Sequence, residues 1–212
     1  MAGLLRIGIC FLALLALAGC ESMNWKTPGD YFAHMRVSPP TEKKLSVCHG
    51  YGCKYRTAVT LSRKDLKDIG RVLKAKSKQD NAKAERKRIA DAVALIERKV
   101  GPVVGSDKDL GQLQLKMAGH RGQQDCVDEA TNTTSYLLLM QENGLLKHHK
   151  VKKPSGRGFF LDGRWQHFSA VVEDTDAHTD WVVDSWPRDN GKLPVVMPLK
   201  TWMSDYDNYA DS

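Results

Sequence analysis

Residues 167–186, HFSAVVEDTDAHTDWVVDSW, have the pattern of a β-hairpin: two runs rich in Val and aromatic residues flank the polar turn DTDA. A loop centred between Thr175 and Asp176 would place His167 directly opposite Asp184. Side chains so paired have Cβ atoms about 4.5–5.5 Å apart, within reach of an imidazole–carboxylate hydrogen bond. The same register pairs Phe168 with Val183 and Ala170 with Trp181 on the other face, where they could pack into a core.

A single cysteine stands upstream, in residues 121–140, RGQQDCVDEATNTTSYLLLM. Apolar residues at helical spacing predict a helix from Cys126 to about Asn143, with Asp125 as its N-cap and Gly144 as its stop. A lone thiol is usually a core residue, but a histidine oriented by an aspartate could take its proton. The helix dipole would favour a thiolate at Cys126, whereas Asp125, Asp128 and Glu129 would oppose it.

Two further helices are expected before this segment. The first starts at Ser62 with Asp65 completing a capping box, and it buries Leu66, Ile69 and Leu73. The second runs from about Asp80 to Lys99 and ends at Gly101 and Pro102. GFFL, near 158–161, is expected to form another short strand. Helices first and sheet second make this an α+β domain.

The order of a Cys at a helix start, then a His and an Asp on consecutive strands, resembles the transglutaminase-like and papain-like cysteine peptidase superfamily. Asp184, Ser185 and Trp186 resemble its N-S-W or D-S-W element. The resemblance covers about residues 100–190 and is strongest to the bacterial transglutaminase-like cysteine proteinases. It implies a papain-like or transglutaminase-like fold, with a helical N-terminal part packed on a small antiparallel sheet.

By the same resemblance, Cys126 is the nucleophile, His167 the base, Asp184 the orienting acid and Trp186 a shielding indole. The chain departs from the papain-like pattern at position 120, where His120 replaces the oxyanion-hole glutamine six residues before the nucleophile. We expect the backbone N–H of Cys126 and the amide of Gln123 or Gln124 to fill that role. His120 remains an alternative base, and the related NlpC-type peptidoglycan endopeptidases usually have a second histidine where this chain has Asp184.

The N-terminus has the layout of a secretory signal over residues 1–19, with Arg6 before the apolar run IGICFLALLALA. The ending LAGC, residues 17–20, resembles the bacterial lipobox, which implies lipidation (palmitate) at Cys20. An uncleaved signal anchor is the alternative. Glu21 after the lipidated cysteine favours the outer membrane. We therefore expect a periplasm-facing protein of the bacterial envelope, attached to the membrane by its N-terminal lipid.

The remaining chain divides into a tether over 20–44 with Pro28, Pro39 and Pro40, a hydrolase domain over 45–205 and a polar tail over 206–212. Cys48 and Cys53, in VCHGYGC, are expected to form a disulfide because the chain is exported; a metal site is the rival interpretation. We expect no resident metal and no cofactor.

The formal net charge is +7, and the basic stretch AKSKQDNAKAERKR (75–88) could suggest nucleic-acid binding. A solvated helix face explains it better, because the stretch lacks interleaved aromatic residues and the chain carries an export signal. We expect a monomer that does not bind nucleic acid.

A Cys-His-Asp triad predicts acyl transfer through a thioester, without distinguishing a protease, an amidase and a crosslinking enzyme. An envelope protein is the first expected substrate and a peptidoglycan stem peptide the second. The alternatives are an inactive transglutaminase-like lipoprotein that binds an envelope protein or peptidoglycan, and a structural lipoprotein whose C-terminal tail docks a neighbour through Trp202, Tyr206 and Tyr209.

Overall fold

A computed structural model describes residues 25–75, 80–158 and 166–204. The signal, Cys20, most of the GFFL strand and the polar tail lie outside these residues. The described elements are α2 (Pro28–Met35), β1 (Lys44–His49), β2 (Tyr55–Thr60), α3 (Arg63–Leu73), α4 (Ala82–Val104), a 3-10 turn (Leu115–Met117), α5 (Cys126–Glu142), β3 (His149–Arg157), β4 (His167–Asp174), β5 (Thr179–Asp184), β6 (Val195–Pro198) and α6 (Leu199–Ser204).

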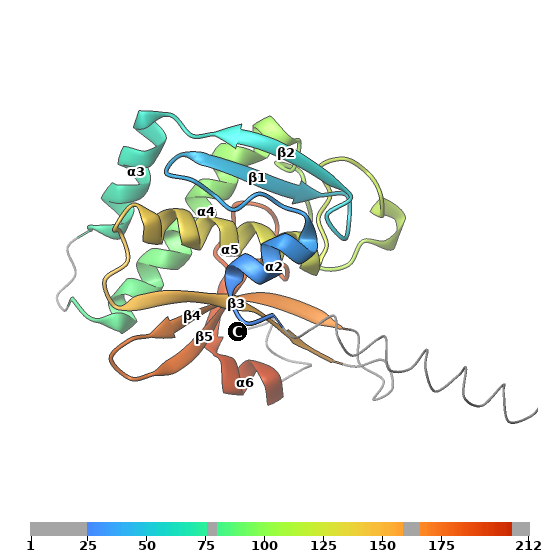
Figure 1. Cartoon of the computed structure of the whole chain (residues 1–212). Coiled ribbons are helices and arrows are strands. Elements are labelled where there is room, and N and C mark those ends of the chain that lie inside the picture. Colours follow the sequence, from blue (N-terminus) through green and yellow to red (C-terminus); the bar gives the residue numbers. More distant parts are fainter. Residues whose placement is uncertain (1–24, 76–79, 159–165, 205–212) are drawn as a thin grey trace, which may run out of the picture.

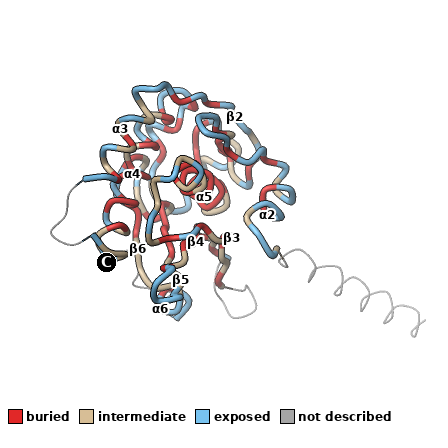
Figure 2. Tube along the Cα trace, turned by 60° about the vertical axis from the view of Figure 1, so that its left-hand side comes forward, coloured by how far each residue is buried: buried red, intermediate tan, exposed pale blue. Residues whose placement is uncertain are grey.

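The described chain is an α+β structure in which α5 runs between two antiparallel sheets (Figure 1). On one side lies the β1–β2 hairpin, and on the other a four-stranded sheet of order β3-β4-β5-β6. α3 and α4 pack together beside them. Buried residues gather along α5 and the inner faces of the sheets (Figure 2). Within the described ranges, no helix has the length and apolarity needed to cross a membrane.

Helix α5 is buried on nearly every side, which explains its weak amphipathic pattern. Its polar residues are satisfied inside the protein: Asn132 Oδ1 accepts from the Cys48 N–H at 2.7 Å, and Asn132 Nδ2 donates to the Cys48 carbonyl at 2.8 Å. These bonds fix α5 against β1, so the N-terminus of α5 has a defined place in the fold.

The predicted starts of two helices are confirmed. Ser62 caps α3 in a capping box with Asp65, and Asp125 caps α5 by accepting from the N–H groups of Val127 and Asp128. Cys126 is therefore the first residue of α5, as its sequence context predicts.

The predicted end of the second helix is wrong. α4 continues through Gly101 and Pro102 to Val104, and Gly105 ends it with φ +85°. Gly101 has a packing role instead, because a Cβ there would lie 2.9 Å from Asn190 Nδ2 and 3.1 Å from the Asp107 nitrogen. Glycine at this position serves a close approach of the backbone, which its sequence context does not distinguish from a helix end.

The hairpin β4–β5 is confirmed, but the predicted register is wrong by two residues. Ala170 pairs with Val183 and Val172 with Trp181, because the turn covers residues 175–178 rather than DTDA. A shift of two keeps every side chain on its expected face. His167 and Asp184 therefore still share a face and meet diagonally, a separation that long side chains can bridge.

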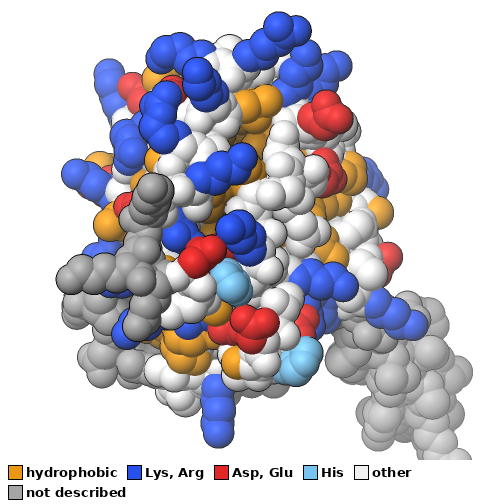
Figure 3. Space-filling model, turned by 90° about the vertical axis from the view of Figure 1, so that its left-hand side faces the viewer, with side chains coloured by type: hydrophobic (Ala, Val, Ile, Leu, Met, Phe, Trp, Pro, Cys, Tyr) orange, Lys and Arg blue, Asp and Glu red, His pale blue; other side chains and the backbone are white. Residues whose placement is uncertain are grey.

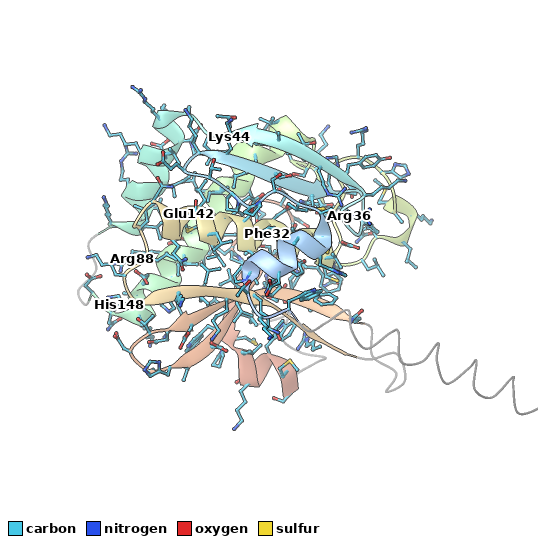
Figure 4. All side chains as sticks on the ribbon, viewed as in Figure 1. Phe32, Arg36, Lys44, Arg88, Glu142 and His148 are labelled. Carbon is cyan, nitrogen blue, oxygen red and sulfur yellow. A yellow bond between two sulfur atoms is a disulfide. The ribbon has the colours of Figure 1, made fainter. Side chains whose placement is uncertain are left out.

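The predicted tether is also wrong for part of its length. Residues 28–35 form α2, which Thr27 caps with Asp30 and which begins with Pro28 at its first position, where proline favours a helix. Phe32, labelled in Figure 4, is fully buried on this helix beside the disulfide. The Tyr31 hydroxyl lies 2.7 Å from Thr131 Oγ1, so α2 packs as part of the domain.

Candidate active site

Cys126 is the free thiol among the described cysteines, since Cys48 and Cys53 form the predicted disulfide with Cα atoms 4.6 Å apart. Its Sγ donates to the Gln166 carbonyl oxygen at 3.8 Å, and the Phe168 N–H is hydrogen-bonded to the same sulfur. The thiol thus lies against the backbone on both sides of His167, where α5 meets the start of β4.

His167 forms the predicted contact with Asp184. Its Nε2 lies 2.7 Å from Asp184 Oδ2, and both side chains are buried. The second ring nitrogen, Nδ1, is also buried. An aspartate on one nitrogen fixes the tautomer and the orientation of the ring, which suits the other nitrogen to proton transfer.

Two indoles enclose this pair. The Trp186 ring centroid lies 4.6 Å from that of His167, in agreement with the shielding position that the resemblance implies. Trp202, on α6, lies 5.4 Å from His167 and donates its Nε1 hydrogen to Asp184 Oδ2 at 3.0 Å. The structure therefore buries Trp202 in the site, so the alternative in which Trp202 docks a neighbour is wrong for this residue. Trp202 and Asp184 are 18 residues apart, and no local sequence pattern predicts their contact.

Burial and the neighbouring Asp125 raise the pKa of the Cys126 thiol to about 12, and the Phe168 N–H acts in the opposite direction. An isolated thiol here would stay protonated at neutral pH. Thiolate formation must therefore be coupled to proton acceptance by a neighbouring base. His167 is the histidine whose neighbours flank the sulfur.

The disulfide loop holds the acids at the start of α5. Asp128 accepts from the N–H groups of Tyr51 at 2.8 Å and Cys53 at 2.6 Å, and Asp125 accepts from Gly52 at 2.9 Å. Burial and the charge of Asp125 raise the pKa of Asp128 to about 8. The N–H groups of the loop thus bind the two carboxylates that, by their charge, would disfavour a thiolate at Cys126. The same hydrogen bonds hold the N-terminus of α5 in place.

The Cys48 and Cys53 sulfurs also lie near Asp128, within 4.8 Å ligand spacing. Because the two sulfurs are bonded to each other, they are not thiolate ligands in this structure.

The three predicted oxyanion-hole donors have different surroundings in the structure. Gln124 is buried, and its amide nitrogen donates to the Cys48 carbonyl at 3.1 Å, so this side chain is engaged with β1. Gln123 is buried and accepts from the Gly50 N–H through its backbone carbonyl. The Cys126 N–H, at the first position of the helix, is outside the pair of N–H groups that Asp125 caps.

The other histidines differ from His167 in their surroundings. His120 is exposed, whereas His49 is buried between Thr57 Oγ1 and the Gly122 N–H. His149 is bonded to the buried Glu85. The exposed His120 is the alternative base that the sequence offers, and the contact between His167 and Asp184 favours His167 instead.

In comparisons with known proteins, no protein-family model, no curated protein and no solved structure matches this chain.

Proposed function

We propose that this protein is a thiol hydrolase of the bacterial envelope that cleaves amides, or transfers acyl groups, through a thioester on Cys126. The observation that carries the proposal is a buried His167, bonded to Asp184, whose flanking backbone contacts the Cys126 sulfur. The α+β arrangement, with the thiol at the start of a helix packed on an antiparallel sheet, supports a papain-like or transglutaminase-like fold.

In the proposed first step, Cys126 Sγ attacks the carbonyl carbon of the substrate while its proton passes to His167. A sulfur–carbon bond forms, the carbon–nitrogen bond breaks, and His167 returns the proton to the leaving amine. Water, or a second amine, then cleaves the thioester. Asp184 would stabilise the imidazolium through its hydrogen bond with His167. The Cys126 N–H, which Asp125 does not cap, would donate to the developing oxyanion.

The substrate class follows from the export signal and the resemblance rather than from the triad. A periplasm-facing protein anchored through Cys20 would meet envelope proteins first and peptidoglycan stem peptides second. Both offer amides that a thioester mechanism can cleave.

A second candidate is an inactive lipoprotein that binds an envelope protein or peptidoglycan at the same place in the fold. One observation favours it: the pKa of Cys126 is raised to about 12 by burial. A thiol with no functional base would behave in this way and react only after unfolding.

The two candidates are separated by the rate of iodoacetamide labelling at Cys126 as a function of pH. The full chain would be studied in detergent, with mass spectrometry locating the label. If His167 accepts the thiol proton, wild-type labelling reaches its plateau well below pH 9. In His167→Ala and Asp184→Ala the rate at pH 7 then falls at least tenfold. His120→Ala, at an exposed histidine, is the matched control and should follow wild type.

Slow labelling that is identical in wild type and His167→Ala, and that becomes fast only in denaturant, would overturn the enzyme proposal and leave the binding protein.

A further inference from the structure

A cavity of about 220 Å³ lies next to the thiol, and its walls come from three separate parts of the chain. The segment before and within α2 supplies one wall, the start of α5 a second, and the start of β4 a third; the lining residues are Trp25, Tyr31, His34, Met35, Val127, Gln166 and Phe168. Gln166 and Phe168 are also the residues whose backbone contacts the Cys126 sulfur. The cavity therefore shares two lining residues with the surroundings of the Cys126 sulfur, although Cys126 itself is not one of its lining residues.

Aromatic rings dominate the wall from the N-terminal segment. The Trp25 ring packs edge-on against Tyr31 with centroids 4.8 Å apart, and its centroid lies 6.2 Å from that of Phe168, another lining residue. The Tyr31 hydroxyl is bonded to Thr131 inside the protein, so this residue adds apolar surface to the cavity. Aromatic surfaces of this kind bind apolar groups by removing their area from water.

The size of the cavity restricts what can fill it. Sites for whole small ligands usually have volumes of about 300–1,000 Å³, so a volume of about 220 Å³ suits a single side chain. The acyl part of a substrate stays bonded to Cys126 in the thioester, so it is the part held closest to the backbone of Gln166 and Phe168.

We propose that this cavity binds one large apolar side chain, aliphatic or aromatic, on the acyl side of the scissile amide. Trp25, Tyr31, His34 and Met35 are then specificity-determining residues of the site rather than part of a tether. This inference rests on the proposed function, and it makes the preferred substrate a peptide or protein segment with a large apolar residue beside the cleaved bond.

The test compares covalent probes on the full chain in detergent. Acetyl-dipeptidyl chloromethyl ketones would carry glycine, leucine or phenylalanine at either of their two positions. Each is attacked by the Cys126 thiolate, which forms a sulfur–carbon bond and releases chloride. Iodoacetamide, which has no side chain, reports the reactivity of the thiol alone, and mass spectrometry locates every label.

We expect the leucine or phenylalanine probes to label Cys126 at least tenfold faster than the glycine probe at one of the positions. His34→Trp, which adds bulk at an exposed residue of the lining, and Trp25→Ala, which removes a wall, should each reduce this ratio at least fivefold. Ala33→Trp, an exposed neighbour on α2 outside the lining, is the matched control and should keep the wild-type ratio.

Equal rates for the three probes, alongside fast iodoacetamide labelling that depends on His167, would overturn this inference and leave the proposed function standing. Slow iodoacetamide labelling that does not depend on His167 would overturn the proposed function and this inference with it. A ratio that falls equally in Ala33→Trp would show that the preference does not come from the cavity and would also overturn it.

Discussion

The oxygen Oδ2 of Asp184 accepts two hydrogen bonds, from His167 at 2.7 Å and from the Trp202 indole at 3.0 Å. Trp202 is itself held, since the Arg157 guanidinium lies 4.2 Å from its ring and donates to its carbonyl. The Trp202 indole thus holds Asp184 in place, and Asp184 in turn orients His167. Trp202 is therefore a positioning residue of the proposed site.

Trp202→Phe removes this donor but keeps an aromatic ring of similar shape. A hydrogen bond to a charged group contributes about 1.5–3 kcal/mol, so we expect the rate of Cys126 labelling at pH 7 to fall roughly tenfold. Asp184→Asn should lower the rate further. Trp181→Phe, an indole on β5 that donates to Thr179, is the matched control. An unchanged rate in Trp202→Phe would show that Asp184 needs no such support.

A second residue-scale prediction concerns Asp109, which is buried and accepts from the Gln124 N–H at 2.9 Å. Burial, with the neighbouring Glu97 and Asp189, raises the pKa of Asp109 to about 7. In this range the folded protein holds the proton more tightly than the unfolded chain. The contribution of Asp109 to stability is therefore full below about pH 4 and is lost as the pH rises toward 7.

Asp109→Asn keeps the acceptor oxygen and removes the titration. At pH 8 we expect its free energy of unfolding to exceed that of wild type by on the order of 2 kcal/mol, and the difference to vanish near pH 4. Guanidinium unfolding at both pH values measures it. Asp107→Asn, on an exposed residue of the same loop, should follow wild type at each pH. A constant difference between pH 4 and pH 8 would argue against a titrating Asp109.

Among the elements, α2 decides whether the N-terminal segment belongs to the domain. The Phe32 side chain is fully buried, with 0% of its surface exposed to solvent, and it packs next to Val37 and the disulfide. Truncation of such a phenylalanine usually costs about 3–5 kcal/mol. Phe32→Ala should therefore lower the free energy of unfolding by about that amount in guanidinium titrations, while Ala33→Ser on the exposed side should change it little. A tether would give no effect for either variant.

Local signals predicted the elements that contain them. Capping chemistry located the starts of α3 and α5, and alternation located β4 and β5, because those cues lie within a few residues. The same kind of cue is present at Thr27, Pro28 and Asp30, where the prolines of the segment were taken for a linker. The β1–β2 hairpin, β3, β6 and α6 are not predicted from the sequence. The β1–β2 pairing is local, with His49 opposite Tyr55, but its burial depends on α5 far along the chain.

Residues of the site also fall into those that local sequence predicts and those that it does not. The contact between His167 and Asp184 could be predicted because a hairpin brings its two strands together, and it survived a register error of two residues because faces alternate with period two. Trp202 and the cavity wall at Trp25 could not be predicted, since they reach the site only through the packing of α6 and α2.

At the scale of the whole molecule, two features bear on the predicted membrane attachment: the net charge and the proposed lipid on Cys20. The face formed on the α3 side carries many Lys and Arg side chains among fewer acids (Figure 3), and the chain has a net charge of +7. Such a surface can approach anionic membranes, but exposed charges are screened beyond about 8–10 Å at physiological salt. A lipid on Cys20 would hold the chain at the membrane at any salt concentration. It would also keep the site close to the bilayer, because the five residues from Cys20 to Trp25 span at most about 18 Å and Trp25 borders the proposed substrate cavity.

Lipidation at Cys20 is tested by Cys20→Ser in a Gram-negative host. We expect the wild-type chain to remain with the membrane fraction in 0.5 M salt, which removes proteins held by charge alone, and the membrane pellet to release it only in detergent. In Cys20→Ser the membrane-bound fraction should fall at least tenfold if the lipid is the anchor, whereas Cys126→Ser, a thiol in the folded domain, should stay bound. Retention of Cys20→Ser in high salt would favour the uncleaved signal anchor, which holds the chain by its apolar run and needs no lipid.

With a lipid anchor the substrate cavity faces targets within a few nanometres of the bilayer, so release by Cys20→Ser should slow cleavage of a membrane-tethered peptide more than that of the same peptide in solution.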